Sequence, residues 1–155
     1  MASRRRTRKK RRRRGGGSLN VKFAIEPVST DGGVPLFNKS QFTEDLPAVS
    51  WSPPSSGYYT FMCVDPDSSE PEWLHWLVTN CKGADPSTGT PVVPWNPPAP
   101  AVGTHRYYFK LYSHANPISA TAPKSRSAFN SGMFVSANRL VPVGQTMIKV
   151  ASNKD

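Results

Sequence analysis

Two histidines, each beside turn-forming residues, are the side chains best suited to binding an anion. His75 comes shortly after the turn sequence Asp65-Pro66-Asp67, and His105 lies in a Gly-Thr-His-Arg-Tyr segment at 103–107. An imidazole among apolar neighbours needs a hydrogen-bond partner. A carboxylate can hold the ring, raise its pKa and leave an N–H for a ligand. We therefore expect Asp65 and Asp67 to orient the histidines, and phosphate affinity to rise as the pH falls through about 6 to 7.

Other uses of these residues are open. Taken alone, Asp-Pro-Asp is typical of a turn, and a single half-buried histidine is typical of a structural residue. Two His and two Asp also suit Zn²⁺ or Fe²⁺, although their spacing matches no standard helix-borne motif. Serines are plentiful, but none lies in a Gly-x-Ser-x-Gly elbow, so a weak hydrolase is a minor alternative. The sequence predicts no catalytic residue, metal or cofactor.

The elements that position the histidines have the apolar pattern of strands. A continuous apolar run at 58–64 indicates a strand buried on both faces. Only 127–140 has helical spacing, with one apolar stripe of Phe129, Met133, Ala137 and Leu140. Six prolines from Pro86 to Pro100 argue against regular structure there. The predicted strands are 21–25, 46–51, 58–64, 73–78, 106–112 and 146–151.

Strand alternation predicts the neighbours of each histidine. It places His75 on one face with Trp73 and Leu77, and His105 on one face with Tyr107. The same alternation points Arg106 away from His105, which favours a structural role for this arginine. If the runs around the first turn pair as a hairpin, Cys63 and Cys81 are not opposite each other, and both are expected to be buried, reduced thiols.

The two histidine segments resemble a known family. Residues 59–67 and 72–80 are similar to the first signature of the phosphatidylethanolamine-binding proteins, and residues 96–106 are similar to the second. The residues in these segments are most similar to those of the plant flowering-signal branch, which has a similar Leu-His-Trp-Leu-Val-Thr run. The resemblance covers about residues 19–150. It implies a mainly β fold, an antiparallel β-sandwich with one or two short helices and an anion pocket at one end.

The resemblance also implies a set of ligand-binding residues. The ligand would be phosphate, a phosphorylated side chain or a lipid headgroup, and the protein would bind it without catalysis. The backbone near 96–98 would form a rim of the pocket. The family usually has a longer loop after the second aspartate, whereas residues 68–71 alone fill this place here. The expected pocket residues are Asp65, Asp67, His75, Pro97, His105 and Tyr107.

The net charge of +10 belongs to one end of the sequence. Of the 20 basic residues, ten lie between Arg4 and Arg14, which leaves ten basic against ten acidic residues from Gly15 onward. A block of like charge cannot bury enough apolar surface to offset its ordering entropy. We expect residues 1–17 to be a disordered tail with a glycine linker and residues 18–155 to form one domain. The tail cations are Arg4, Arg5, Arg6, Arg8, Lys9, Lys10, Arg11, Arg12, Arg13 and Arg14.

Such a tail is suited to polyanions. Its expected partners are nucleic acid, through phosphate contacts without sequence readout, or an acidic protein such as an import receptor. Anionic lipid is a further alternative. The expected location is nuclear or cytoplasmic, with neither a transmembrane segment nor a signal peptide. Arginine-rich arms on compact β-domains are also typical of viral particles, so a structural or genome-associated virion protein, encoded by a virus, is the alternative function.

Overall fold

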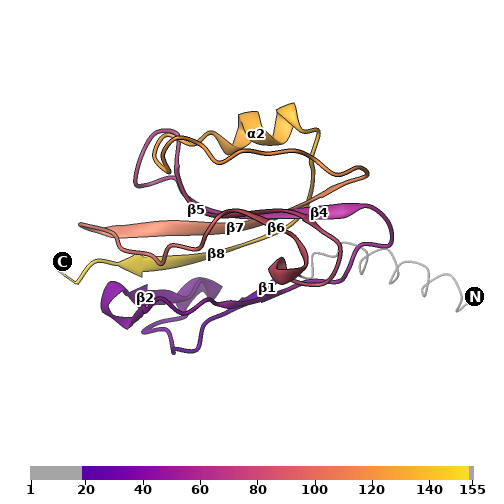
Figure 1. Ribbon diagram of the computed structural model, residues 1–155. Coiled ribbons are helices and arrows are strands. Elements are labelled where there is room, and N and C mark those ends of the chain that lie inside the picture. The colour runs from indigo at the N-terminus through magenta and orange to yellow at the C-terminus, as the bar shows by residue number, and fades with distance from the viewer. Residues whose placement is uncertain (1–18, 154–155) are drawn as a thin grey trace, which may run out of the picture.

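The central element of the fold is a six-stranded sheet with the order β2-β8-β7-β4-β5-β6. Figure 1 shows this sheet nearly edge-on. The computed structural model describes residues 19–153. All neighbouring strands are antiparallel except β2 and β8, which are parallel. The strands are β2 (Leu36–Asn38), β4 (Tyr58–Asp65), β5 (Trp73–Cys81), β6 (Thr90–Val93), β7 (Thr104–His114) and β8 (Val141–Ala151).

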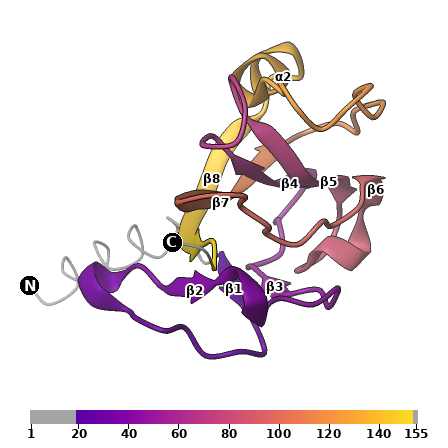
Figure 2. The same ribbon diagram turned by 90° about the vertical axis from the view of Figure 1, so that its left-hand side faces the viewer.

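Each face of this sheet is covered by a different layer. A small antiparallel sheet of β1 (Asn20–Lys22) and β3 (Ala48–Ser50) lies on one side, and helix α2 (Ser131–Ala137) lies on the other (Figures 1 and 2). Three short 3₁₀ turns, η1 (Asp31–Gly33), η2 (Lys39–Gln41) and η3 (Pro86–Thr88), complete the described elements. The predicted mainly β fold of the sandwich type is therefore confirmed. No helix within 19–153 is long and apolar enough to cross a membrane.

Two cores follow from this layering. The first core lies between the two sheets and includes Phe37, Trp51 and Phe61. The second core lies under α2 and includes Met62 and Leu140. Successive residues of β4 thus enter opposite cores, which confirms a strand buried on both faces. Each fully buried Phe, Met or Leu side chain contributes about 1.5–3 kcal/mol to the free energy of unfolding through apolar burial.

The predicted helix is shorter than expected, and only Phe129 and Leu140 of its predicted stripe are buried. Ala128 has a φ of 59°, and Phe129 pairs with Glu72 in an isolated β-bridge, so neither is helical. The helix begins after Asn130, whose side chain accepts a hydrogen bond from the Met133 amide. Met133 is 68% exposed, and it is Phe134 and Val135 that pack on the second core.

Other boundaries also differ. The strand expected at 21–25 is only β1, because its pairing partner β3 is equally short. The proline-rich stretch does contain regular structure, namely η3 and β6. Pro91 is tolerated because β6 is an edge strand, where one backbone N–H per pair of residues has no ladder partner. The two thiols are confirmed as free and buried, and burial raises the pKa of Cys81 to about 12.

Candidate anion pocket

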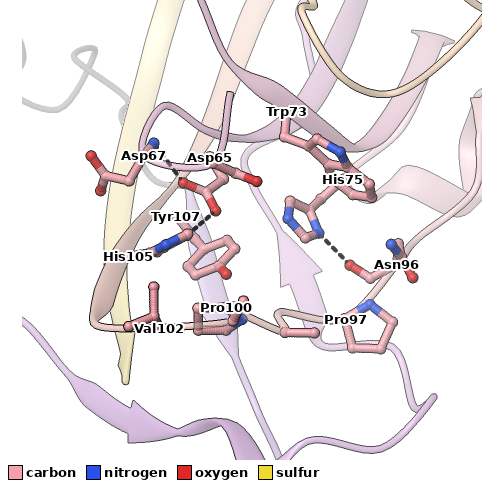
Figure 3. Close-up of a pocket in the computed structure, with 13 residues that line it drawn as sticks. Asp65, Asp67, Trp73, His75, Asn96, Pro97, Pro100, Val102, His105 and Tyr107 are labelled. Atoms are coloured by element: carbon pink, nitrogen blue, oxygen red, sulfur yellow. Dashed lines mark hydrogen bonds and ion pairs between the residues drawn. The ribbon is translucent and has the colours of Figure 1, made fainter. Parts of the chain in front are cut away.

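The six predicted pocket residues lie around one cavity at one end of the six-stranded sheet (Figure 3). Because β4 runs antiparallel to β5 and β7, the end of β4 meets the starts of both neighbours at the same edge. The cavity has a volume of about 520 Å³. It is lined by Asp65, Asp67, Ser68, Trp73, His75, Asn96, Pro97, Ala99, Pro100, Ala101, Val102, His105 and Tyr107.

A buried carboxylate holds the second histidine. Asp65 is 1% exposed, and its Oδ2 lies 2.7 Å from Nδ1 of His105. Its Oδ1 accepts a hydrogen bond from the Asp67 amide at 2.7 Å, which fixes the turn after β4. The ring of Tyr107 stacks on His105, and burial together with the nearby Asp65 carboxylate raises the pKa of the tyrosine. His105 therefore presents Nε2 as its remaining hydrogen-bonding atom.

A β-bulge places the first histidine. Leu74 pairs with Val64 and Trp76 pairs with Cys63, so His75 is an extra residue without a partner on β4. The rings of His75 and Trp76 both contact Trp95, at centroid distances of 6.4 and 5.3 Å. Two consecutive side chains thus lie on the same face of the sheet.

The bulge overturns part of the predicted alternation. His75 does share a face with Trp73, at 4.7 Å between ring centroids. Leu77 was expected there too, but it lies on the opposite face in the second core with Leu74. The prediction was wrong because strict alternation holds only for a strand without a bulge.

The ring of His75 is held by a hydrogen bond to a backbone carbonyl and not to a carboxylate. Nδ1 of His75 lies 2.6 Å from the Asn96 carbonyl oxygen, and the Asn96 amide donates to the His75 carbonyl at 3.0 Å. The ring is also 5.0 Å from the ring of Tyr107. Burial lowers the pKa of His75 to about 4, which is opposite to the rise expected from a carboxylate partner.

Asp67 does not orient a histidine, contrary to the expectation. Its two oxygens accept hydrogen bonds from Nε and Nη2 of Arg106, at 2.9 and 2.7 Å, and Oδ2 also accepts from the Arg106 amide. This fork lowers the pKa of Asp67 chiefly through the side-chain hydrogen bond. The pair closes one side of the pocket and ties the β4–β5 turn to β7.

Arg126 contacts the backbone that carries the site. The sequence did not indicate this role. Its guanidinium donates to the carbonyls of Leu74 and His75 at 3.1 Å and to that of Pro94 at 2.9 Å. It also lies over the Trp73 ring, 5.6 Å from the centroid. Arg126 therefore joins the bulge to the rim of the pocket.

Replacing Arg126 with leucine is expected to lower the free energy of unfolding by about 2 kcal/mol, because three carbonyls lose a charged donor. Urea unfolding measures this. The matched control is Arg126→Lys, whose single ammonium cannot bond three separate carbonyls and should recover less than half of the loss. A lysine variant as stable as the wild type would show that the forked contacts contribute little.

Sequence reasoning thus found the polar residues of the pocket and missed part of its wall. Trp73 and Val102 line the cavity, whereas Pro98, expected in the rim, is buried and does not line it. The shared face of Trp73 and His75 was the available signal for the tryptophan. Within residues 19–153, no group of three or more His, Cys, Asp or Glu side chains is placed to hold a metal ion.

Comparison with known proteins places this chain in a family. The family model described as Phosphatidylethanolamine-binding protein matches residues 12–140. The chain belongs to this family. Solved structures of phosphatidylethanolamine-binding proteins also share its fold. One from Plasmodium vivax has a TM-score of 0.64 at 19% identity, covering 86% of this chain and 84% of its own.

Other similar proteins agree with the assignment. Protein BROTHER of FT and TFL 1 from Arabidopsis thaliana is 36% identical over 87 residues, which are 51% of this chain and 49% of that protein. Protein SELF-PRUNING from Solanum lycopersicum is 36% identical over 91 residues, covering 54% and 52%. The chain thus spans about half the length of the curated relatives it matches. A carboxypeptidase Y inhibitor, solved with its cognate proteinase, has a TM-score of 0.70 at 17% identity and covers 86% of this chain and 82% of its own.

Proposed function

We propose that this protein is a non-enzymatic binding module for a phosphate-bearing ligand, either a small phosphate compound or a phospholipid headgroup. The observation that carries the proposal is the convergence of His75, His105 and Tyr107 on one cavity of about 520 Å³. This volume lies within the usual range of small-molecule sites, roughly 300–1,000 Å³. Membership of the phosphatidylethanolamine-binding protein family supports the same ligand class.

The arrangement of polar atoms suits recognition of one compact group. Each histidine has its Nδ1 engaged, His105 with Asp65 and His75 with the Asn96 carbonyl, so both rings are held in place. Rigid rings reduce the ordering cost of binding. The carboxylate of Asp67 is neutralised by Arg106 and therefore repels an anion less than a free carboxylate would.

The tail adds a second proposed activity. Residues 4–14 lie outside the described part of the chain, and their ten cations support binding to nucleic acid or to an acidic import receptor. The protein would then act in the nucleus or the cytoplasm. Eight of the ten are arginines, whose planar fork matches phosphate geometry.

Titration of the full-length protein with inorganic phosphate and with phosphoethanolamine tests the pocket. We expect a His75→Ala, His105→Ala double variant to bind at least about tenfold more weakly, since one lost charge-assisted hydrogen bond costs about 1.5–3 kcal/mol. Histidine NMR signals separate the pocket from the tail. The signals of His75 and His105 should shift with ligand.

His114 is the internal control for that titration. It is buried in a different place, between Thr60 and the Asn116 carbonyl, with both ring nitrogens engaged. Its signal should not move. Equal shifts of all three histidines, or unchanged affinity of the double variant, would refute the pocket.

A further inference from the structure

The hydrogen bond to Asn96 determines which nitrogen of His75 carries a proton. A carbonyl oxygen can only accept, so Nδ1 must be the N–H donor in the 2.6 Å contact. In the neutral ring Nε2 then has a lone pair and no hydrogen. Figure 3 shows this second nitrogen facing the cavity, across from Asp65 and Tyr107. The unliganded site therefore presents an acceptor, not a donor, at this position.

The surroundings of His75 do not favour a second proton on the ring. His75 is 4% exposed, and burial lowers its pKa to about 4. The Asp65 carboxylate favours a positive ring, but it is already bonded to His105. The guanidinium of Arg126, bonded to the His75 carbonyl, and the nearby His105 both oppose a positive ring. Tyr107 stays neutral because burial raises its pKa.

We propose that the pocket selects phosphate monoesters over phosphodiesters, because a monoester brings its own hydroxyl to donate to Nε2 of His75. This inference rests on the proposed function and specifies its ligand: of the two proposed sources, it favours a small phosphate monoester over an intact phospholipid, whose headgroup is linked through a diester. A monoanionic monoester has one P–OH and two further oxygens for other donors. A diester anion has no hydrogen to donate, so it meets the His75 lone pair with an oxygen lone pair.

The cost of placing one proton in the complex sets the size of the preference. The complex holds one proton between the phosphate oxygen and Nε2. A monoester, with a second pKa of about 6, carries this proton at a cost of roughly tenfold in affinity at pH 7. A diester needs a protonated His75, which costs up to about 10³-fold at pH 7 for a ring with pKa about 4. The preference for the monoester at pH 7 is therefore at most about 10²-fold.

Methyl phosphate and dimethyl phosphate are a matched pair for the test, since neither has an ammonium group. Calorimetric titrations of the full-length protein at pH 7.5, in two buffers with different ionisation enthalpies, count the protons taken up. We expect methyl phosphate to take up roughly one proton and to weaken about tenfold per pH unit above about 6.5. Dimethyl phosphate should bind at least about tenfold more weakly at pH 7, with a smaller gap at pH 5.

Each alternative result has a distinct meaning. Equal affinities for the two esters, or methyl phosphate binding without proton uptake, would overturn the selectivity and leave the phosphate pocket standing. Failure of both esters to bind at millimolar concentration, or binding of ethanolamine in their place, would refute the proposed function as well.

A His75→Gln variant tests the role of this ring directly. Glutamine can bond a ligand oxygen through its amide but does not titrate, so the monoester preference at pH 7 should fall to within about threefold. A variant that keeps the wild-type preference would overturn the assignment to His75. If the variant does not fold, as judged by circular dichroism, the proton count of the wild type decides alone.

Discussion

Deleting residues 1–17 is expected to lower affinity for a 20-nucleotide DNA by at least about 10²–10³-fold at low salt. The physical reason is counterion release, which scales with the number of phosphates neutralised. If about five phosphates are engaged, a fourfold rise in salt should weaken the full-length protein on the order of 10²–10³-fold. From Gly15 onward the chain has ten basic and ten acidic residues, so its net charge is zero and does not attract DNA.

Fluorescence anisotropy at several salt concentrations measures this effect. A charge-matched control replaces the eight tail arginines with lysine, which should preserve the salt slope while weakening binding only modestly. Binding of methyl phosphate should be unchanged in the truncated protein. Loss of both activities together would show that the tail and the pocket do not act independently.

Replacing Asp65 with alanine is expected to lower the free energy of unfolding by about 3 kcal/mol, because it removes one partner of a buried pair. Two contacts are lost, to Nδ1 of His105 and to the Asp67 amide. The value is at the low end for buried pairs because the His105 side chain is 15% exposed. Methyl phosphate affinity should also fall at least about tenfold, since the His105 ring is no longer held.

Asp65→Asn is the matched control. It keeps one acceptor oxygen for the Asp67 amide, and its NH2 group can donate to Nδ1 of a neutral His105 in the other tautomer, so its loss of stability should be about 1 kcal/mol. Urea unfolding and phosphate titration are measured for both variants. If the alanine variant unfolds within about 0.5 kcal/mol of the wild type, the pair does not stabilise the site.

The region of the pocket could be predicted because its residues lie at strand ends. Asp65 ends a strand buried on both faces, and His75 and His105 come near the starts of later strands. In an antiparallel arrangement these positions meet at one edge of a sheet. The family signatures supplied the order of the strands, which periodicity alone does not give.

The partners of each polar group could not be predicted. Asp67 was expected beside a histidine and instead bonds Arg106, because it lies beyond the end of β4, within reach of the Arg106 amide and guanidinium. The helix was predicted to begin too early because Phe129 is apolar and has helical spacing. In the structure, Phe129 instead forms a β-bridge with Glu72. In both cases a contact distant in sequence overrode a local pattern.

By itself, the sequence determined the mainly β character, the concentration of ten cations before Gly15, and the turn and strand-end positions of Asp65, His75 and His105. These follow from composition and short-range periodicity, which are properties of neighbouring residues. Only the tertiary structure decided the bulge at His75, the hydrogen bond of its Nδ1 to Asn96 and the contacts of Arg126, 51 residues away, with its backbone. Register and hydrogen-bond partners depend on how distant segments pack together, so the protonation of the site is a property of the fold.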